Sequence, residues 1–328
     1  MLQYRSLFGP VAVVLLVGAA ILWSPFEPHR PPTGSEAGEP GALDGQVAGP
    51  AGAGASDAAT WLDADWAVLE AKARWAAAGG LDTVPLGVAI AEIGRTFVGT
   101  AYVPQTLEVE GPERLVINFQ GLDCVTFVES AFALARFVRA GGAERLGDRL
   151  AAQALYEGFL RELRYRDGVI DGYPSRLHYF SDWIADNTRR GLVADVGAEL
   201  GGVRDPEPVD FMTTHTDAYR QLAEPANIAR AREAEARLTA VGRWYVPEER
   251  IAEVAGRIQN GDIIAATSTV SGLDVAHTGL ALWVDGTLRL LHAPLVGDSV
   301  EISEVPLAER ILGISGQDGI MVARPIAP

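Results

Sequence analysis

The sequence predicts an α+β fold, because helical and strand patterns occupy different parts of the chain. Before residue 166, apolar residues recur at helical spacing in the runs 57–78, 84–98, 124–139 and 151–165. A further helical run, rich in Ala, Arg and Glu, covers residues 228–241. In the last third, short apolar runs bounded by turn residues predict strands at 262–267, 276–284, 287–293, 300–305 and 319–324. Helices that precede a block of strands are typical of an α+β domain.

The N-terminal segment lies outside this predicted fold. Residues 1–24 contain an apolar run from Leu7 to Trp23, which predicts a signal anchor or a signal peptide. Residues 25–56 are rich in Gly, Pro and Ala and lack periodicity, which predicts a flexible tether. Residues 57–328 are then expected to form a single domain. Both interpretations of the apolar run place this domain at or beyond a membrane, so we expect an exported protein that is either membrane-anchored or periplasmic.

Composition excludes some functions. The formal charge is −16, with 43 acidic against 27 basic residues. We therefore expect no nucleic-acid partner, because phosphates attract a basic surface. The chain contains one cysteine and so forms no intrachain disulfide. Its thiol is either buried and inert or kept for chemistry.

That cysteine, Cys124, is predicted at the start of a helix. Gly121 permits a tight turn, and Asp123 is a favourable N-cap residue. From Cys124 to Ala135 the apolar residues share one helical face. Because the partial positive charge of a helix N-terminus favours a thiolate, Cys124 is a candidate nucleophile. A small core cysteine is the alternative, since free thiols are commonly buried.

Two histidines are predicted to lie side by side on a hairpin. The dipeptide Asp285-Gly286 is a strong signal for a two-residue hairpin turn. With that turn, Gly279 faces His292. His277 is then the diagonal neighbour of His292 on the same face, with Cβ atoms about 7 Å apart. A three-residue loop would instead put the two rings on opposite faces.

One cysteine and two histidines suffice for thiol catalysis. His277 would take the thiol proton as general base and later protonate a leaving amine. His292 would hold the His277 ring in its tautomer. The alternatives are two partly buried histidines bonded to backbone groups, and a zinc site built from Cys124, His215, His277 and His292. Because no local metal motif such as H-E-x-x-H occurs, we expect neither a metal nor a cofactor.

Two segments, 165–187 and 211–219, interleave polar groups with aromatic rings. Neither has a clean helical or strand period. Such a composition favours the wall of a ligand site over a plain core. A loop pinned to the core by its rings is the alternative.

The chain resembles the NlpC/p60 papain-like cell-wall hydrolases. Their Asp-Cys, His-x-Gly and His-Ala pattern occurs here at 123–124, 277–279 and 292–293. The similarity to one subgroup, domain of unknown function 1460, is closer and covers about residues 85–326. The shared motifs are Asp-Cys-Val-Thr-Phe-Val-Glu at 123–129, Tyr-Pro-Ser-Arg-Leu-His-Tyr-Phe-Ser-Asp-Trp at 173–183, Met-Thr-Thr-His at 212–215, Asn-Gly-Asp-Ile-Ile at 260–264 and Gly-Leu-Asp at 272–274.

The resemblance implies a papain-like fold, in which N-terminal helices and the cysteine helix pack on a central antiparallel sheet. It implies that Cys124 is the nucleophile, His277 the base and His292 the orienting residue. It also implies that Asp123 contacts the peptide end of the ligand, in competition with its helix-cap role. Val125-Thr126 replaces the Ser-Gly that commonly follows the cysteine in the superfamily. This departure agrees with the subgroup and counts against the endopeptidase specificity of other members.

Members of the subgroup are N-acetylmuramoyl-L-alanine amidases that act on peptidoglycan fragments. The resemblance therefore implies cleavage of the amide between N-acetylmuramic acid and L-alanine, with muropeptides as partners and a location facing the cell wall. The alternatives are a D-glutamyl–diaminopimelate endopeptidase and a non-catalytic cell-wall-binding protein. An arginine suits the carboxylates of a stem peptide. The residues expected to contact substrate are Asp123, Arg176, His178, Tyr179, Trp183 and His215.

Overall fold

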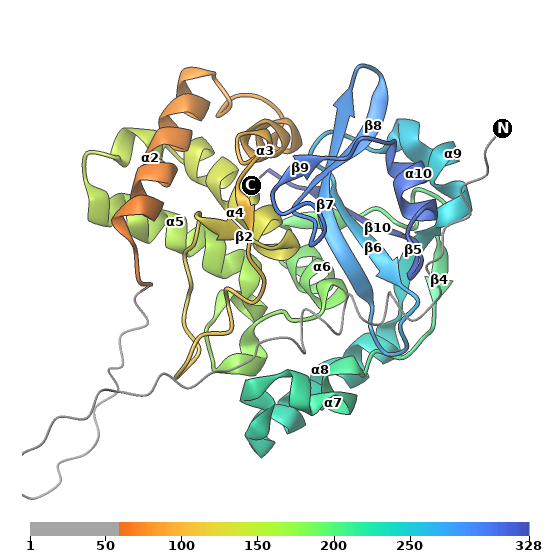
Figure 1. Ribbon diagram of the computed structural model, residues 1–328. Coiled ribbons are helices and arrows are strands. Elements are labelled where there is room, and N and C mark those ends of the chain that lie inside the picture. The colour runs from red at the N-terminus through yellow and green to blue at the C-terminus, as the bar shows by residue number, and fades with distance from the viewer. Residues whose placement is uncertain (1–58, 328) are drawn as a thin grey trace, which may run out of the picture.

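An eight-stranded antiparallel sheet forms the centre of the computed structural model, which describes residues 59–327 (Figure 1). The strand order is β4-β5-β10-β6-β7-β8-β9, and β3 also pairs with β10. The bounds are β3 Val193–Asp195, β4 Val203–Asp205, β5 Arg243–Pro247, β6 Ile263–Ser268, β7 Val275–Val284, β8 Thr287–His292, β9 Glu301–Ile302 and β10 Gln317–Pro325. Two short strands, β1 Ala101–Tyr102 and β2 Gly121–Leu122, pair in parallel just before the cysteine helix.

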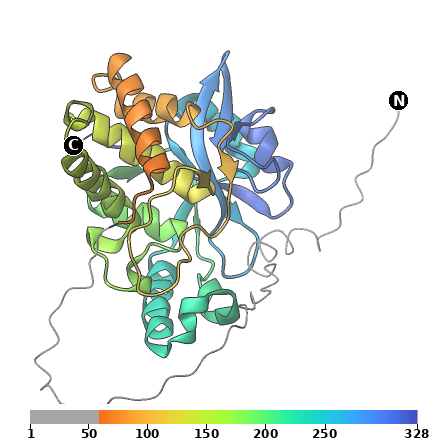
Figure 2. The ribbon, with the colours of Figure 1, turned by 60° about the vertical axis from the view of Figure 1, so that its left-hand side comes forward.

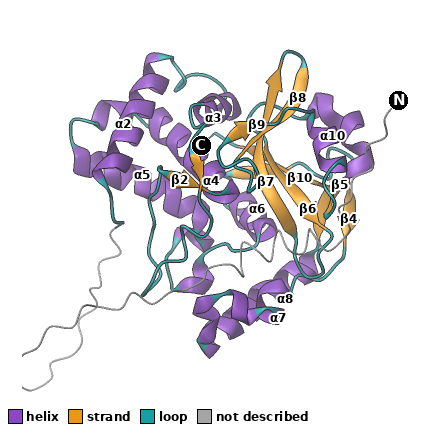
Figure 3. Cartoon of the chain, viewed as in Figure 1, coloured by secondary structure: helices purple, strands orange, loops and turns teal. Residues whose placement is uncertain are grey.

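Helices cover both faces of the sheet (Figures 2 and 3). The N-terminal helices on one side are α2 Asp63–Ala78, α3 Leu86–Arg95, α4 Cys124–Arg139, α5 Arg149–Arg164 and α6 Phe180–Arg189. The other side carries α9 Ile251–Val254 and α10 Leu307–Leu312. Helices α7 Phe211–Thr214 and α8 Pro225–Val241 form a further layer at the bottom of Figure 1. This arrangement confirms the predicted α+β fold.

The sheet is buried on both faces, which explains the continuous apolar run of β6. Ile263 and Ala265 pack in a large core with the N-terminal helices, whereas Ile264 and Ala266 pack in a second core with α9 and α10. Successive side chains of a strand point to opposite faces, so a strand between two helical layers is apolar at every position. The cysteine helix α4 contributes to the large core and contacts β7.

The hairpin of β7 and β8 has the predicted two-residue turn. Val284 pairs with Thr287, and the register continues along both strands without a shift. Asp285 and Gly286 have φ angles of 49° and 77°. Positive φ at both turn residues is the geometry of a type I′ turn, which matches the twist of the strands.

The sequence prediction misses several elements, including α6, α10 and β5. Helix α6 lies inside the predicted aromatic wall. Its apolar residues Phe180, Trp183 and Ile184 share one helical face, but the helix is short and also buries polar side chains. Residues 115–119, which lead toward β2, form only a single bridge, from Val116 to Thr60. The strand expected at 300–305 shortens to β9.

The predicted signal segment at 1–24 and tether at 25–56 lie outside the described residues. The single domain expected at 57–328 also begins and ends just beyond them, and stays a prediction. Within residues 59–327, none of the helices has the length and apolar character needed to span a bilayer.

Candidate active site

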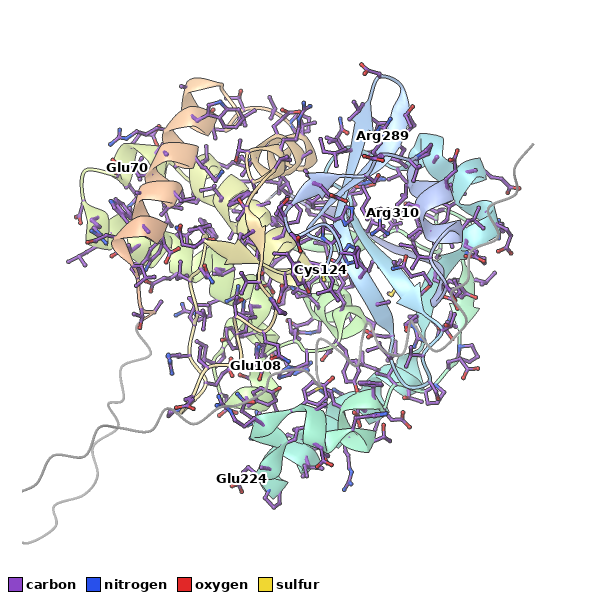
Figure 4. All side chains as sticks on the ribbon, in the orientation of Figure 1. Glu70, Glu108, Cys124, Glu224, Arg289 and Arg310 are labelled. Atoms are coloured by element: carbon purple, nitrogen blue, oxygen red, sulfur yellow. The ribbon has the colours of Figure 1, made fainter. Side chains whose placement is uncertain are left out.

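A cleft of about 670 Å³ opens where the N-terminal end of α4 meets β7. Figure 4 labels three of its lining residues, Glu108, Cys124 and Arg310, which follow one another from the lower part of the view upward. The lining also includes Tyr102, Asp123, Val125, Ala276 and His277. Cys124 therefore lines a cleft instead of lying wholly in the core, and it shares that cleft with His277.

Cys124 follows a capped helix start. Asp123 Oδ1 accepts a hydrogen bond from the N–H of Thr126 at 2.8 Å, and Thr126 Oγ1 accepts one from the N–H of Asp123 at 2.9 Å. This capping box confirms Asp123 as the N-cap residue. The N–H groups of Cys124, Val125 and Thr278 point toward the sulfur. Thr278 also donates its hydroxyl to the Cys124 carbonyl at 3.4 Å, so the backbone at Cys124 lies against β7 at the residue that follows His277.

Glycine is needed at position 121 because there is no room for a side chain, and not because the backbone angle is unusual. A Cβ atom at this position would lie 2.3 Å from Cγ2 of Val103, and its φ is not positive. Only glycine lets the strand before the cysteine approach the neighbouring chain so closely.

The two predicted histidines contact each other directly. Nε2 of His277 lies 2.8 Å from Nδ1 of His292, and the ring planes are 85° apart. This hydrogen bond confirms that both rings share one face of the hairpin. A Cβ atom at Gly279 would lie 2.9 Å from Cβ of His292, so the glycine makes room for the second ring. The bond occupies Nε2 of His277 and leaves Nδ1 for another partner.

Burial keeps the thiol and both imidazoles neutral in the free protein. Burial and the Asp123 carboxylate raise the pKa of Cys124 to about 12, although the nearby N–H groups oppose this. Burial lowers the pKa of His277 to about 3, with a contribution from Arg310. Burial likewise lowers the pKa of His292 to about 2. The helix N-terminus favours the thiolate, but desolvation outweighs it, so the thiol form dominates in the free protein.

Tyr102 is a cleft residue that the sequence does not reveal. Burial, and to a lesser extent the neighbouring acidic groups of Cys124 and Asp123, raises the pKa of Tyr102 above its usual value. Its hydroxyl therefore stays protonated and can donate a hydrogen bond. Tyr102 reaches the site because β1 pairs with β2, a contact between segments about twenty residues apart that no local pattern signals.

Two of the expected substrate contacts line the cleft but already have partners. Arg176 forms ion pairs with Glu108 at 2.7 Å and with Glu113 at 3.3 Å. Nε2 of His178 lies 2.9 Å from the carbonyl oxygen of Tyr173. In the free protein, Arg176 therefore holds the loop that follows β1, and its charge is compensated.

Three other expected contacts lie away from the cleft. Trp183 is 0% exposed, and its ring stacks on Phe180 at 5.0 Å. Tyr179 is buried and donates its hydroxyl to Glu235 of α8 at 2.8 Å. His215 is exposed at the C-terminal end of α7. Tyr179 also accepts a hydrogen bond from the N–H of Met212, so it links α6, α7 and α8. Trp183 donates to Glu129 of α4, and His215 stacks on Phe211 of its own helix.

The zinc alternative needs His215 beside Cys124 and the histidine pair, and the structure separates them. Among residues 59–327, no three His, Cys, Asp or Glu side chains converge as metal ligands. The alternative of backbone-bonded histidines also differs from the structure, since His277 and His292 bond ring to ring.

Fold and cleft together define an α+β protein in which a cysteine helix meets a histidine pair on an antiparallel sheet. A family model described as AmiA-like, N-acetylmuramoyl-L-alanine amidase-like, matches residues 92–316. The chain belongs to this family. The match confirms the family that the sequence motifs indicate.

Solved structures agree with this assignment. An N-acetylmuramoyl-L-alanine amidase from Bacteroides uniformis is 35% identical, with a TM-score of 0.68 over 74% of this chain and 99% of that one. A Bacteroides fragilis protein provisionally named a xylanase is 38% identical, with a TM-score of 0.65 over 70% and 98%. Protein LPG0564 from Legionella pneumophila, of family DUF1460, is 20% identical and shares the fold, with a TM-score of 0.57 over 81% and 95%. Among curated proteins, none matches the chain.

Proposed function

We propose that the protein is a muropeptide amidase that cleaves the amide between N-acetylmuramic acid and L-alanine through Cys124, His277 and His292. The observation that carries this proposal is the hydrogen bond of 2.8 Å between the two imidazoles, one of which lines the same cleft as Cys124. An oriented imidazole next to a thiol supports general-base activation of that thiol. The family and the Bacteroides uniformis amidase support the choice of bond.

Glu301 favours the tautomers that catalysis needs. To accept the thiol proton, His277 must have an unprotonated Nδ1, so its Nε2–H donates to Nδ1 of His292. His292 then carries its own hydrogen on Nε2, which lies 3.7 Å from Oε1 of Glu301. The carboxylate attracts that N–H and stabilises the positive charge that His277 gains during attack.

The reaction proceeds through a thioester on the sugar side. The sulfur of Cys124 gives its proton to His277 as it attacks the lactyl carbonyl carbon. The N–H groups of Cys124 and Val125 and the hydroxyl of Tyr102 are the donors available to the oxyanion. The C–N bond then breaks, and the L-alanine amine leaves with the proton from His277. Water, deprotonated by His277, hydrolyses the thioester and restores the thiol.

The same cleft disfavours a glycosidase. Hydrolysis of a glycosidic bond ordinarily uses two carboxyl groups that flank it. Each carboxylate that lines the described cleft has a structural partner: Asp123 caps α4, Glu108 pairs with Arg176 at 2.7 Å, and Glu129 pairs with Arg164 at 2.7 Å. We therefore do not extend the name of the Bacteroides fragilis relative to this chain.

We also propose that the domain works outside the cytoplasmic membrane, facing the cell wall. The apolar run in residues 1–24 and the substrate class support this location. Cell fractionation should recover the protein from the membrane or the periplasm, and recovery from the cytosol would contradict the proposal.

The products of muropeptide digestion test the proposed reaction. The amidase releases intact L-alanyl peptide and free N-acetylmuramic acid, both identified by mass. Release of a fragment that still joins muramic acid to L-alanyl-D-glutamate supports the endopeptidase instead. Unchanged substrate supports the non-catalytic alternative. Cys124→Ala should abolish hydrolysis, because it removes the only thiol of the chain.

A further inference from the structure

We propose that the guanidinium of Arg310 is a subsite for a carboxylate of the stem peptide, at the histidine end of the cleft. This inference rests on the proposed function and adds which end of the cleft holds the peptide part of the substrate. Arg310 lines the cleft together with Cys124 and His277, and Figure 4 shows it above the cysteine, where α10 meets the sheet.

Helix α10 covers the face of the sheet that carries the histidines. Ile311 of α10 shares a core with Ala281 of β7 and Leu290 of β8. His277 precedes Ala281 by four residues and His292 follows Leu290 by two. Since side chains alternate along a strand, both rings point to the face that α10 covers. The arginine that precedes Ile311 is thereby brought to the histidine end of the cleft.

Arg310 differs from the other two arginines of the cleft in having no carboxylate partner. Arg164 pairs with Glu129, and Arg176 pairs with Glu108, each at 2.7 Å. Across residues 59–327, Arg310 forms no ion pair, and its Nη1 atom is buried without a hydrogen-bond partner. A buried donor without a partner is unfavourable, so a ligand oxygen that accepts from it gains binding energy.

The charge of Arg310 is also poorly compensated. Burial lowers the pKa of Arg310, and the charge of Glu301 opposes this only in part. A guanidinium nevertheless stays charged at neutral pH. A carboxylate is the matching ligand, because the planar fork of arginine binds its two oxygens with parallel hydrogen bonds.

Gln317 supplies a second unpartnered group in the same wall. Its Oε1 atom is buried without a hydrogen-bond partner, and the residue lines the cleft. A carboxamide oxygen accepts from a peptide N–H. One wall therefore offers a cation for a carboxylate and an acceptor for an amide, which together match an acidic peptide.

The chemistry of the leaving group also places the peptide at the histidine end of the cleft. The L-alanine amine must lie next to His277 to receive its proton, so the peptide extends from the histidine side of the cleft. Arg310 lies on that side, near enough to lower the pKa of both histidines. Two carboxylates of the stem peptide can reach it: the α-carboxylate of the D-glutamate and the C-terminal carboxylate.

Steady-state kinetics test the subsite with three substrates: a muropeptide with both acids free, one with D-isoglutamine in place of D-glutamate, and one with an amidated C-terminus. Loss of the bound carboxylate should raise KM by about 10- to 100-fold with little change in kcat. The substrate that suffers this loss identifies which carboxylate is bound. Arg310→Gln should bind all three substrates equally weakly, and Arg310→Lys should keep part of the discrimination.

Arg237→Gln is the matched control, because Arg237 is exposed on α8 and does not line the cleft. It makes the same change of charge and should keep the wild-type KM values. Equal KM values for the three substrates with the wild type, or unchanged discrimination in Arg310→Gln, would overturn the subsite. The wild-type comparison decides the question even if Arg310→Gln does not fold.

Calorimetry distinguishes failure of the Arg310 subsite from failure of the proposed amidase function. Cys124→Ala is titrated with the same three muropeptides, which it is not expected to cleave. Weaker binding of one of the two amidated ligands, with that difference lost in the Cys124→Ala, Arg310→Gln double variant, supports the subsite even if the wild type cuts a different bond. Equal binding of all three ligands overturns the subsite while leaving the amidase proposal intact.

Discussion

Burial determines the chemical state of the single thiol. Cys124 sits at the positive end of a helix, with three N–H groups directed at its sulfur, yet desolvation raises its pKa to about 12. The same desolvation lowers the pKa of His277 to about 3. The free protein therefore has a neutral thiol and a neutral imidazole in one cleft, and in the proposed mechanism the proton moves during the attack on the carbonyl.

Alkylation kinetics test this resting state. The rate at which iodoacetamide modifies Cys124 should rise about tenfold per pH unit between about pH 6 and about pH 9, because only the thiolate reacts. His277→Gln should leave this profile unchanged while lowering kcat by about 100-fold or more, since it removes the general base. A plateau below neutral pH would instead indicate a preformed thiolate stabilised by an imidazolium.

Local rules suffice to place the candidate nucleophile and the two histidines. A helix cap, a turn dipeptide and the two-residue period of a strand place Cys124, His277 and His292 without knowledge of the fold. These rules do not locate the substrate wall. Trp183 and Tyr179 belong to a polar and aromatic stretch, and such a composition is the same whether the rings line a cleft or support a helix.

Among the elements, the β7–β8 hairpin depends on one glycine for the geometry of the site. A Cβ atom at Gly279 would lie 2.8 Å from the Leu291 carbonyl oxygen and 2.9 Å from Cβ of His292. Either the two strands must separate or His292 must move, and both changes disturb its hydrogen bond to His277.

Gly279→Ala should therefore reduce kcat by at least about tenfold and destabilise the protein by about 1–3 kcal/mol, as expected for overpacking. Kinetics and thermal unfolding measure the two effects. Gly158→Ala is the control, because a Cβ atom at Gly158 on α5 meets nothing within 4 Å. That variant should keep full activity, and an unchanged kcat in Gly279→Ala would mean that the position of His292 does not matter.

Helices and strands with strong local sequence signals were predictable. Those that are recognisable only by their pairing or packing with distant segments were not. The β7–β8 hairpin follows from alternating residues around Asp285-Gly286. Strand β5 contains arginine and proline and is recognisable only through its pairing with β4 and β10. Helix α10 has only 6 residues, too few for a clear helical period, yet it supplies Arg310 to the cleft.

For the whole molecule, the buried histidines make stability depend on pH. In the folded chain the pKa of His277 is about 3 and that of His292 about 2, whereas an unfolded histidine titrates near its ordinary value of about 6.5. Below that value the unfolded chain binds protons that the folded chain excludes. The free energy of unfolding therefore falls as the pH drops from about 6.5 toward about 3.

Denaturation at several pH values checks this dependence. Each buried histidine should remove at most about 1.4 kcal/mol per pH unit below about pH 6.5. His277→Gln should show a shallower loss than the wild type over the same range. The carboxylates are common to both proteins, so the difference isolates the histidine. Parallel curves would show that His277 is protonated as easily in the folded chain as in the unfolded one.

The general architecture was predictable, whereas the cleft was not. The order of helical and strand patterns indicates an α+β fold, and the motifs indicate the family. The cleft instead arises where the loop after β1, the start of α4 and the α10 region meet around β7. Those segments are far apart in the sequence, and no local rule states how they pack.

The acyl-enzyme is the most direct test of the central claim. Wild-type protein is mixed with a muropeptide, quenched in acid during turnover and weighed intact, and the modified residue is then mapped. The account predicts one adduct on Cys124 with the mass of the N-acetylmuramoyl group and free L-alanyl peptide in solution. An adduct that also contains L-alanyl-D-glutamate, or turnover that continues in Cys124→Ala, would contradict it.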